Sequence, residues 1–474
     1  MSALRASLRS LLTPFNLVVA AAQIVLLGLF LVDWKLPVVV MAAILITIVL
    51  LDRPVVAVAM MLAARLISTG SMSFLNVGGI TIGLFEPVLL YALVALGLRA
   101  VFTRHKLWRW WPWQLVFGAI LLWRVAGLTW SLTITEGLKD CITLCVVIAT
   151  STVIMAFLET WEDVKLAIYF WIGACVLIGI LAIFGDLLGL TDYSSTWKAA
   201  SRGGRETGLG QQPNWFAMNL MFVIIPAAAM ALIQKELLLR WAFLVATLFI
   251  YFTTMTSGSR GGAYSVVIGA GIVALGQPLF RKWAIRFGAL GFVMFLIAWF
   301  GNLGDIGKGL NRIVLSSSSI LEGDVRGMNW AACIQMFVHT DGLGIGTGGY
   351  VAALKTYSWW LYNSVYRYPH GIFWSEMSHG GIIGVILLFT LVGVIGKMSM
   401  DTIRMARGTE AEPLAWAMPA SMAGYFAWSF VEFELDEKPF WEWLAVYTAL
   451  HLVLRKVHAE GKKLPEWKLG SGEA

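Results

Sequence analysis

Residues 213–233 read PNWFAMNLMFVIIPAAAMALI, a run of 21 residues without one charged side chain. A helix needs about 20 predominantly apolar residues to cross the hydrocarbon core of a bilayer, so this segment predicts a membrane span. The run decides the fold because similar runs recur along most of the chain. Hydrophobic residues make up 59% of the sequence and charged residues only 13%, and the mean hydropathy is +0.76. This composition excludes a soluble globular protein and predicts an all-α polytopic membrane protein.

Working outward from this run, fourteen segments reach or approach span length. The first follows Arg5 and Arg9 without a small-residue cleavage site, so we interpret it as a retained helix rather than a signal peptide. Four of the segments are short, and the expected count is about 12–14 transmembrane helices. The candidate segments are 15–32, 36–51, 54–69, 80–98, 113–129, 140–158, 164–190, 213–233, 241–256, 262–280, 283–300, 371–396, 413–431 and 440–454.

One long polar interval divides these segments. We expect an N-terminal transmembrane bundle of about eleven spans in residues 1–300, a large loop at 301–369, C-terminal transmembrane helices at 370–455 and a tail at 456–474. Within the loop, residues 326–340 place apolar side chains at helical spacing and predict a short amphipathic helix. The glycine-rich residues 342–349 predict a tight turn. The tyrosines and tryptophans that follow suit either an interfacial belt or stacking on sugars.

The distribution of basic residues predicts which side the loop faces. Lysine and arginine accumulate in cytoplasmic loops. If the N-terminus is cytoplasmic, 21 of the 35 basic residues fall in inner segments, and nine of the twelve outer ones gather in three places. An even span count agrees with this alternation. We therefore expect both termini in the cytoplasm and the large loop outside, covering a catalytic site on the outer face of the membrane.

The outer basic residues are the candidates for chemistry. Arg202 and Arg205 lie in SRGGRETG (201–208), just before the run at 213–233, and Arg260 lies in the SRG turn at 259–261. A guanidinium matches phosphate oxygens and stays charged at any working pH, so arginines beside glycines at helix ends suit a diphosphate. A lone outer arginine is better explained by solvation or snorkelling than by phosphate binding. The hypothesis therefore depends on several of them acting together with a histidine.

His370 opens the span at 371–396 and is the candidate base. Imidazole can be a neutral proton acceptor near pH 7, and nearby arginines favour the neutral form. His339 and His379 are weaker candidates. No D-x-D-type acidic cluster was recognised in the outer loops, so we expect no metal and no cofactor, and a metal-dependent sugar-nucleotide mechanism is not supported.

These three features resemble the bacterial O-antigen ligase and Wzy-type O-antigen polymerase superfamily, membrane glycosyltransferases that use polyprenyl-diphosphate-linked glycans. The similar pieces are R-x-T-G-x-G-x-x-P-N at 205–214, Ser259-Arg260-Gly261, and His370 with Gly381 eleven residues later. The resemblance implies that Arg205 and Arg260 bind the donor diphosphate, with Arg202 and Arg326 as helpers, and that His370 activates the acceptor. Gly371 and Trp374 depart from the ligase pattern, which has Asn and Leu there.

The resemblance implies an inverting, metal-independent glycosyltransferase at the periplasmic face. Its donor would be an undecaprenyl-diphosphate-linked glycan. The acceptor would be lipid A-core in a ligase, or a second lipid-linked glycan in a polymerase of O-antigen or exopolysaccharide. Membrane lipids are the other expected partners, and no nucleic acid is expected because most of the +7 net charge lies in cytoplasmic segments. Two alternatives stay open: a polytopic transporter or lipid-linked glycan flippase using Arg65 and Arg124, and a peptidoglycan polymerase of the shape and division class, which would need an outer acidic residue.

Overall fold

The computed structural model describes residues 53–67, 75–77, 80–83, 85–103, 111–184, 212–278, 280–282, 285–286, 289, 293, 325–363, 368–462 and 464–467. The predicted spans at 15–32 and 36–51 and most of the one at 283–300 lie outside these residues. So do Arg202 and Arg205.

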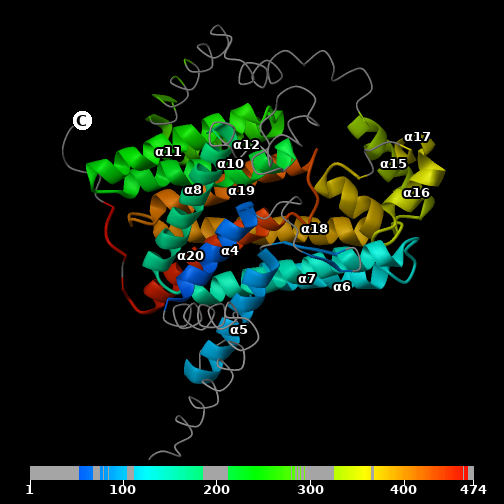
Figure 1. Ribbon diagram of the computed structural model, residues 1–474, viewed down its shortest axis with the longest axis horizontal. Coiled ribbons are helices and arrows are strands. Elements are labelled where there is room, and N and C mark those ends of the chain that lie inside the picture. Colours follow the sequence, from blue (N-terminus) through cyan, green and yellow to red (C-terminus); the bar gives the residue numbers. More distant parts are fainter. Residues whose placement is uncertain are drawn as a thin grey trace, which may run out of the picture.

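The described residues are mostly helical (Figure 1). Five helices are long and apolar enough to cross a membrane: α7 (Ile134–Phe157), α8 (Trp161–Phe184), α10 (Pro213–Ile233), α11 (Leu237–Thr256) and α18 (Ile372–Ala406). The chain is therefore an all-α, polytopic membrane protein, as its composition predicts. Shorter or more polar helices complete the bundle: α4 (Pro54–Ile67), α5 (Phe85–Thr103), α6 (Pro112–Gly127), α12 (Arg260–Gly276), α19 (Glu412–Ser429) and α20 (Lys438–Ala459).

Most helix bounds lie within a few residues of the apolar runs, but α7 begins at Ile134 rather than at 140, and α18 ends at Ala406 rather than at 396. Helix α10 occupies the predicted 213–233, but the span predicted at 80–98 begins too early. Residues Ile80–Ile82 form strand β2, paired antiparallel with β1 (Leu75–Val77), and α5 begins only at Phe85. Two β-branched isoleucines around a threonine suit a strand, which is why an apolar run here is not wholly helical.

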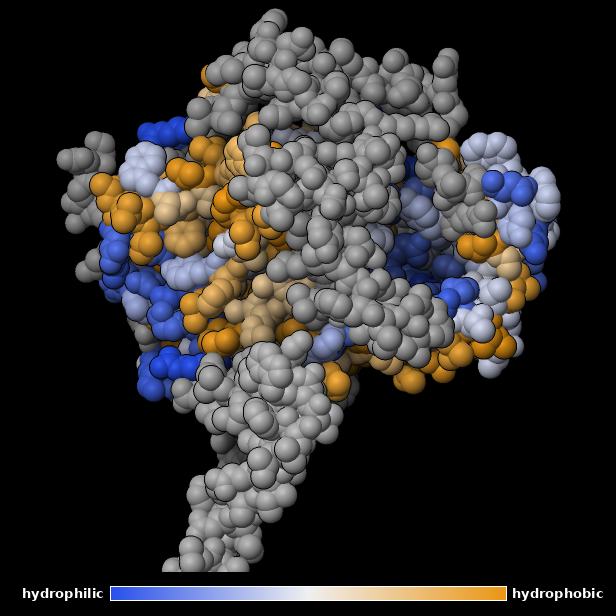
Figure 2. Space-filling model, in the orientation of Figure 1, coloured by the Kyte–Doolittle hydropathy of each residue, from blue (hydrophilic) through white to orange (hydrophobic). Residues whose placement is uncertain are grey.

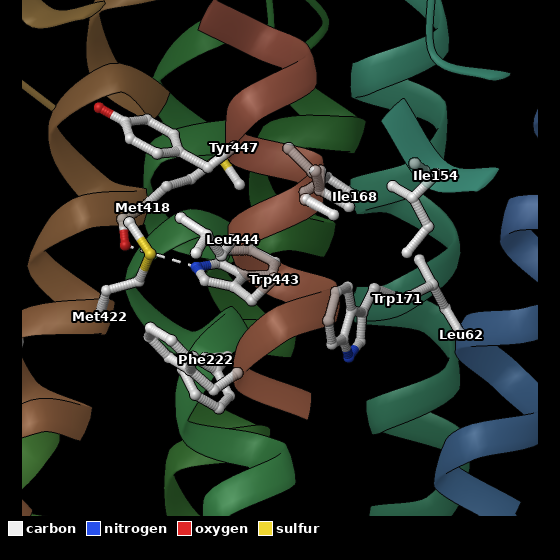
Figure 3. Close-up of a cluster of buried hydrophobic side chains, with 14 of the residues drawn as sticks. Leu62, Ile154, Ile168, Trp171, Phe222, Met418, Met422, Trp443, Leu444 and Tyr447 are labelled. Carbon is white, nitrogen blue, oxygen red and sulfur yellow. Dashed lines mark hydrogen bonds between the residues drawn. The ribbon is translucent and has the colours of Figure 1, made fainter. Parts of the chain in front are cut away.

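Helix α20 lies in the interior of the bundle and is packed by α7, α8, α10, α18 and α19. Its Trp443 side chain is fully buried and meets Trp171 of α8 edge-on, with ring centroids 4.9 Å apart (Figure 3). The indole N–H donates to the Met418 carbonyl oxygen over 3.4 Å. A buried tryptophan needs such a partner, so this bond fixes α20 against α19.

Glycines bring α12 and α19 into close contact. A Cβ added at Gly424 would lie 2.2 Å from the carbonyl oxygen of Ser265, and one added at Gly269 would lie 2.8 Å from that of Ala420. Helices in membranes associate through small residues that let their backbones approach. This contact sets the position of the first turn of α12, where Arg260 lies.

The bundle has two distinct ends. The first, called the loop end here, is formed by the first turns of α10, α12, α18 and α20 together with three loop helices: α15 (Val325–His339), α16 (Tyr350–Tyr357) and α17 (Trp359–Tyr362). Figure 1 shows the loop helices at its right, against α6, α7 and α18. Helix α15 matches the predicted helix at 326–340.

The opposite end, called the tail end, joins the α10–α11 and α18–α19 turns to the last described residues. Lys235 pairs with Glu410 over 3.4 Å, and the Glu410 amide donates to the Pro465 carbonyl oxygen over 2.9 Å. Among the coloured residues of Figure 2, hydrophobic ones gather left of the centre and along the lower right, and hydrophilic ones lie toward the left margin and right of the centre. An apolar band between two polar ends is the expected surface of a membrane-spanning bundle.

Candidate functional site

Helix α18 is broken near the loop end. Gly381 has φ 60° and ψ −150°, a conformation that is not helical and that side-chain-bearing residues avoid. The glycine run at 342–349 packs into this break. The Gly342 carbonyl oxygen accepts from the Ile382 amide over 2.9 Å, and the Ile345 amide donates to the Ser378 carbonyl oxygen over 2.8 Å. The backbone groups released by the break are thus satisfied by protein, as the membrane interior demands.

The glycine run is therefore a docked segment rather than a simple turn. Gly342, Gly344, Gly346 and Gly348 all have positive φ, between 77° and 83°. A Cβ at Gly346 would lie 2.5 Å from the Gly127 carbonyl oxygen at the end of α6. Gly344, Gly346 and Gly348 combine a left-handed backbone with direct contact between main chains, so only glycine fits these three positions.

His370 lies two residues before α18, at the loop end. It has φ 52°, and its side chain is only 4% exposed. The Trp330 indole N–H of α15 donates to its carbonyl oxygen over 2.9 Å, and the Tyr368 ring lies 3.7 Å from the imidazole between centroids. Burial, and secondarily the charge of Arg326, lower the pKa of His370 to about 3. The imidazole is therefore neutral at physiological pH.

The residue after His370 explains one departure from the ligase pattern. Gly371 has φ 143°, and a Cβ there would lie 2.4 Å from the Phe430 carbonyl oxygen. Asparagine could not adopt this conformation against that contact. The glycine follows from the close approach of the end of α19 to the start of α18.

Glu432 joins two of the regions singled out from the sequence. Its Oε1 accepts from the Asn214 amide at the start of α10 over 2.7 Å, and its Oε2 pairs with Nη2 of Arg326 on α15. Asn214 closes the R-x-T-G-x-G-x-x-P-N segment. Helix α15, through Arg326, and the end of this segment, through Asn214, therefore both contact the buried carboxylate of Glu432.

A further contact brings the His370 region to the same place. The Gln212 side chain hydrogen-bonds the Tyr368 hydroxyl, and the charges of Glu432 and Arg326 both act on that phenol. Gln212 is the N-cap of α10 and lies two residues before Asn214. The loop end thus places Gln212, Asn214, Arg326, Tyr368 and His370 around Glu432.

Arg260 lies at the same end but in a separate contact. It is the first residue of α12, and the Ser259 hydroxyl caps that helix by accepting from the Gly262 amide over 3.4 Å. A Cβ at Gly261 would lie 1.9 Å from Nε1 of Trp428, in the last turn of α19. No described contact joins Arg260 to His370 or Arg326. Arg202 and Arg205, as noted, lie outside the described residues.

A second polar cluster lies beside the break in α18. The Ser375 hydroxyl donates to Glu434 Oε2 over 2.9 Å and lies 3.3 Å from Nδ1 of His379. Nearby, the Tyr350 hydroxyl donates to Asn329 Oδ1 over 2.5 Å. His379, a weaker candidate in the sequence, is thus buried in this cluster, whereas His339 is exposed on α15.

The carboxylates at this end were missed in the sequence. Residues 432–437 read EFELDE and lie in the turn between α19 and α20, at the loop end. The available signal was four acidic residues within six in a chain with only 13% charged residues. They escaped notice because they do not form a D-x-D motif within a polar loop.

The two in-span arginines are paired with buried acids. Arg65 Nε donates to Glu442 Oε1 over 2.7 Å, and Arg124 Nη2 pairs with Glu376. Both carboxylate side chains are 1% exposed. Within the described part of the chain, no group of three His, Cys, Asp or Glu side chains is arranged to hold a metal ion.

Comparison of the chain with protein-family models gives no match, and comparison with curated proteins gives none either.

Proposed function

We propose that the protein is an integral membrane glycosyltransferase of the O-antigen ligase and polymerase type. It transfers a glycan from undecaprenyl diphosphate to an acceptor sugar hydroxyl, with inversion and without a metal. The loop end faces the periplasm, both termini face the cytoplasm, and the membrane is the bacterial inner membrane. Among the described residues, the helices alternate between the loop end and a tail end that carries Lys235, Arg404 and Arg455, which supports this orientation.

One observation carries the proposal. Three segments that are far apart in the sequence meet at the loop end: the start of α10 through Asn214, the loop helix through Arg326, and the residues at 368–370. The first ends one piece of the resemblance, and the last contains His370. A charged arginine beside a buried, neutral histidine is a suitable arrangement for acid–base chemistry on an anionic donor.

The reaction then follows from the chemistry of the groups. The acceptor hydroxyl oxygen bonds to the anomeric carbon of the donor glycan as the bond from that carbon to the diphosphate oxygen breaks. Nε2 or Nδ1 of His370 accepts the hydroxyl proton. Arg260 and Arg205, with Arg202 and Arg326 as helpers, stabilise the negative charge that develops on the leaving undecaprenyl diphosphate. In a ligase the acceptor is lipid A-core; in a polymerase it is a second lipid-linked glycan.

The test is a reconstituted transfer reaction. Purified protein in lipid nanodiscs is given an undecaprenyl-diphosphate oligosaccharide, with lipid A-core, with excess lipid-linked glycan, or with neither. We expect release of undecaprenyl diphosphate together with extension of one of the two acceptors. Extension of lipid A-core identifies a ligase, and extension of the lipid-linked glycan identifies a polymerase. The absence of product with both acceptors would contradict the proposal.

A transporter or lipid-linked glycan flippase is the second candidate, and the break in α18 favours it. Discontinuous helices near ion pairs form substrate sites in many transporters. Arg124 and Glu376 lie close to this break. Movement of a fluorescent lipid-linked glycan across proteoliposomes, without transfer in the reaction above, would favour transport.

A further inference from the structure

Glu432 is unusually well held for an acidic residue at the end of a membrane bundle. Its side chain is 2% exposed, and each of its two oxygens takes a different donor, Asn214 on one side and Arg326 on the other. Burying a carboxylate is costly unless it is paired and hydrogen-bonded. Both conditions are met here, so the side chain has one well-defined position.

The backbone that carries Glu432 is fixed as well. The next residue, Phe433, is buried and packs edge-on against Trp428, with ring centroids 4.6 Å apart, and stacks on Tyr425 at 5.8 Å. The same Trp428 meets Gly261 in the first turn of α12. Aromatic packing therefore fixes the turn after α19, which carries Glu432. Through Trp428, the same packing also contacts the first turn of α12, which begins with Arg260.

Arg326 is held differently from its partner. Its side chain is 35% exposed, whereas that of Glu432 is 2% exposed. A long arginine side chain at such exposure has many rotamers, and ordering it costs conformational entropy. Because the Glu432 carboxylate pairs with Nη2 of Arg326, the arginine side chain has fewer rotamers open to it before a ligand binds. The exposed part of the Arg326 side chain can still contact a ligand.

We propose that Glu432 is a positioning residue of the donor site. It holds Arg326 and the start of α10 in the geometry that receives the diphosphate, and it makes no contact with the reacting atoms itself. This inference rests on the proposed function, because it assigns the role of Glu432 within that transfer reaction. Without Glu432, the Arg326 side chain would no longer be held in place, and the donor would bind more weakly.

A purely structural ion pair would behave differently. Breaking a buried pair lowers the stability of the fold, which reduces the amount of active protein and leaves the KM of the surviving molecules unchanged. A positioning role predicts a higher donor KM in protein that is folded. The ratio of the donor KM to the acceptor KM distinguishes the two roles: it rises if Glu432 is a positioning residue and stays constant if the ion pair is purely structural.

The experiment compares Glu432→Gln, Arg326→Ala and the double variant, as folded protein in nanodiscs, by steady-state transfer and by direct binding of undecaprenyl diphosphate. Glutamine keeps the size and one acceptor oxygen but removes the charge. We expect each single variant to raise the donor KM roughly tenfold with the acceptor KM within about twofold, and the double variant to be no worse than Arg326→Ala.

Glu442→Gln is the matched control. Glu442 is equally buried and pairs with Arg65, but it lies within α20, away from Glu432. This variant should lower thermal stability without changing the donor KM. An unchanged donor KM in Glu432→Gln, or effects that simply add in the double variant, would overturn the inference. Wild-type protein that neither binds donor nor transfers would instead refute the proposed function.

Discussion

The Ser375 hydroxyl donates a hydrogen bond to Glu434 over 2.9 Å, joining the first turn of α18 to the turn between α19 and α20. Nδ1 of His379 lies 3.3 Å from the same hydroxyl. Burial, and secondarily the nearby charge of Asp436, raise the pKa of Glu434 to about 8. At neutral pH the folded protein therefore favours the protonated acid at this junction.

This shift predicts how stability depends on pH. The folded-state pKa of Glu434 exceeds its ordinary value of 4.5, so the folded protein holds this proton more tightly than the unfolded chain. Its contribution to stability is present in full below pH 4.5 and is lost as the pH rises through about 8. Glu434→Gln should therefore gain in thermal unfolding midpoint relative to wild type between about pH 5 and about pH 9. The exposed Glu466→Gln is the control, and a constant difference between Glu434→Gln and wild type would contradict the assignment.

His370→Ala should abolish transfer while leaving the donor bound. Removing a general base typically costs a factor of about 10² to 10⁴ in rate, so we expect kcat to fall by at least roughly 100-fold. The dissociation constant for undecaprenyl diphosphate should stay within about threefold of wild type. His458→Ala, at the exposed tail end, should retain wild-type rates. Substantial transfer by His370→Ala would remove this residue from the mechanism.

Arg260→Ala should weaken donor binding rather than acceptor binding. A hydrogen bond to a charged group contributes about 1.5–3 kcal/mol, which corresponds to a rise of roughly 10- to 100-fold in the donor dissociation constant. Titration of nanodisc-embedded protein with undecaprenyl diphosphate measures this change. Arg404→Ala serves as control, because its side chain is 75% exposed near the tail end. Equal donor affinity in the two variants would show that Arg260 does not contact the diphosphate.

Gly381→Ala should destabilise the protein by at least about 2 kcal/mol. A Cβ at this position would lie 2.1 Å from the Gly342 carbonyl oxygen, and the backbone conformation excludes alanine in any case. Gly393→Ala is a matched control in the same helix, since a Cβ there meets nothing within 4 Å. In detergent, the thermal unfolding midpoint should be lower than that of wild type for Gly381→Ala and should not be lower for Gly393→Ala. Equal midpoints would mean that α18 is continuous at Gly381.

Glu376→Gln should be destabilising because it leaves the buried Arg124 charge without its partner. Breaking a buried pair costs about 3–5 kcal/mol, whereas exposed pairs contribute about 0–1 kcal/mol. Glu162→Gln is the comparison, because Glu162 pairs with Lys165 but its own side chain is 77% exposed. Thermal unfolding of both variants measures the difference. If the midpoint of Glu376→Gln equals that of Glu162→Gln, the Arg124–Glu376 pair does not stabilise the fold.

The membrane fold could be predicted because hydropathy is a property of consecutive residues. The run at 213–233 gave the bounds of α10, since a bilayer selects helices by length and apolar content. The extended conformation of Ile80–Ile82 could not be predicted in this way, because pairing with Leu75–Val77 overrides a purely apolar pattern. The expected number of spans stays a prediction, because several candidate segments lie outside the described residues.

The site was predictable only in part, for a different physical reason. His370 stands out because it lies at a span end, and Arg326 because it lies in the long polar loop. Glu432 becomes a candidate only through its contacts with Asn214 and Arg326. Such contacts join residues more than a hundred positions apart, and no local pattern encodes them. The glycine run likewise predicted a turn, whereas its positive φ angles serve its docking against α18.

That docking bears on how substrates reach the loop end. The glycine run is hydrogen-bonded into α18 on both sides of Gly381, through Ile345 and Ile382, and the Thr347 hydroxyl donates to the Arg124 carbonyl oxygen over 2.6 Å. An outward movement of α15 and α16 would break these main-chain hydrogen bonds between the glycine run and α18, and buried main-chain groups would lose their partners. The described half of the loop is therefore fixed against α18. In the proposed reaction, a glycan would have to pass this part of the loop without displacing it.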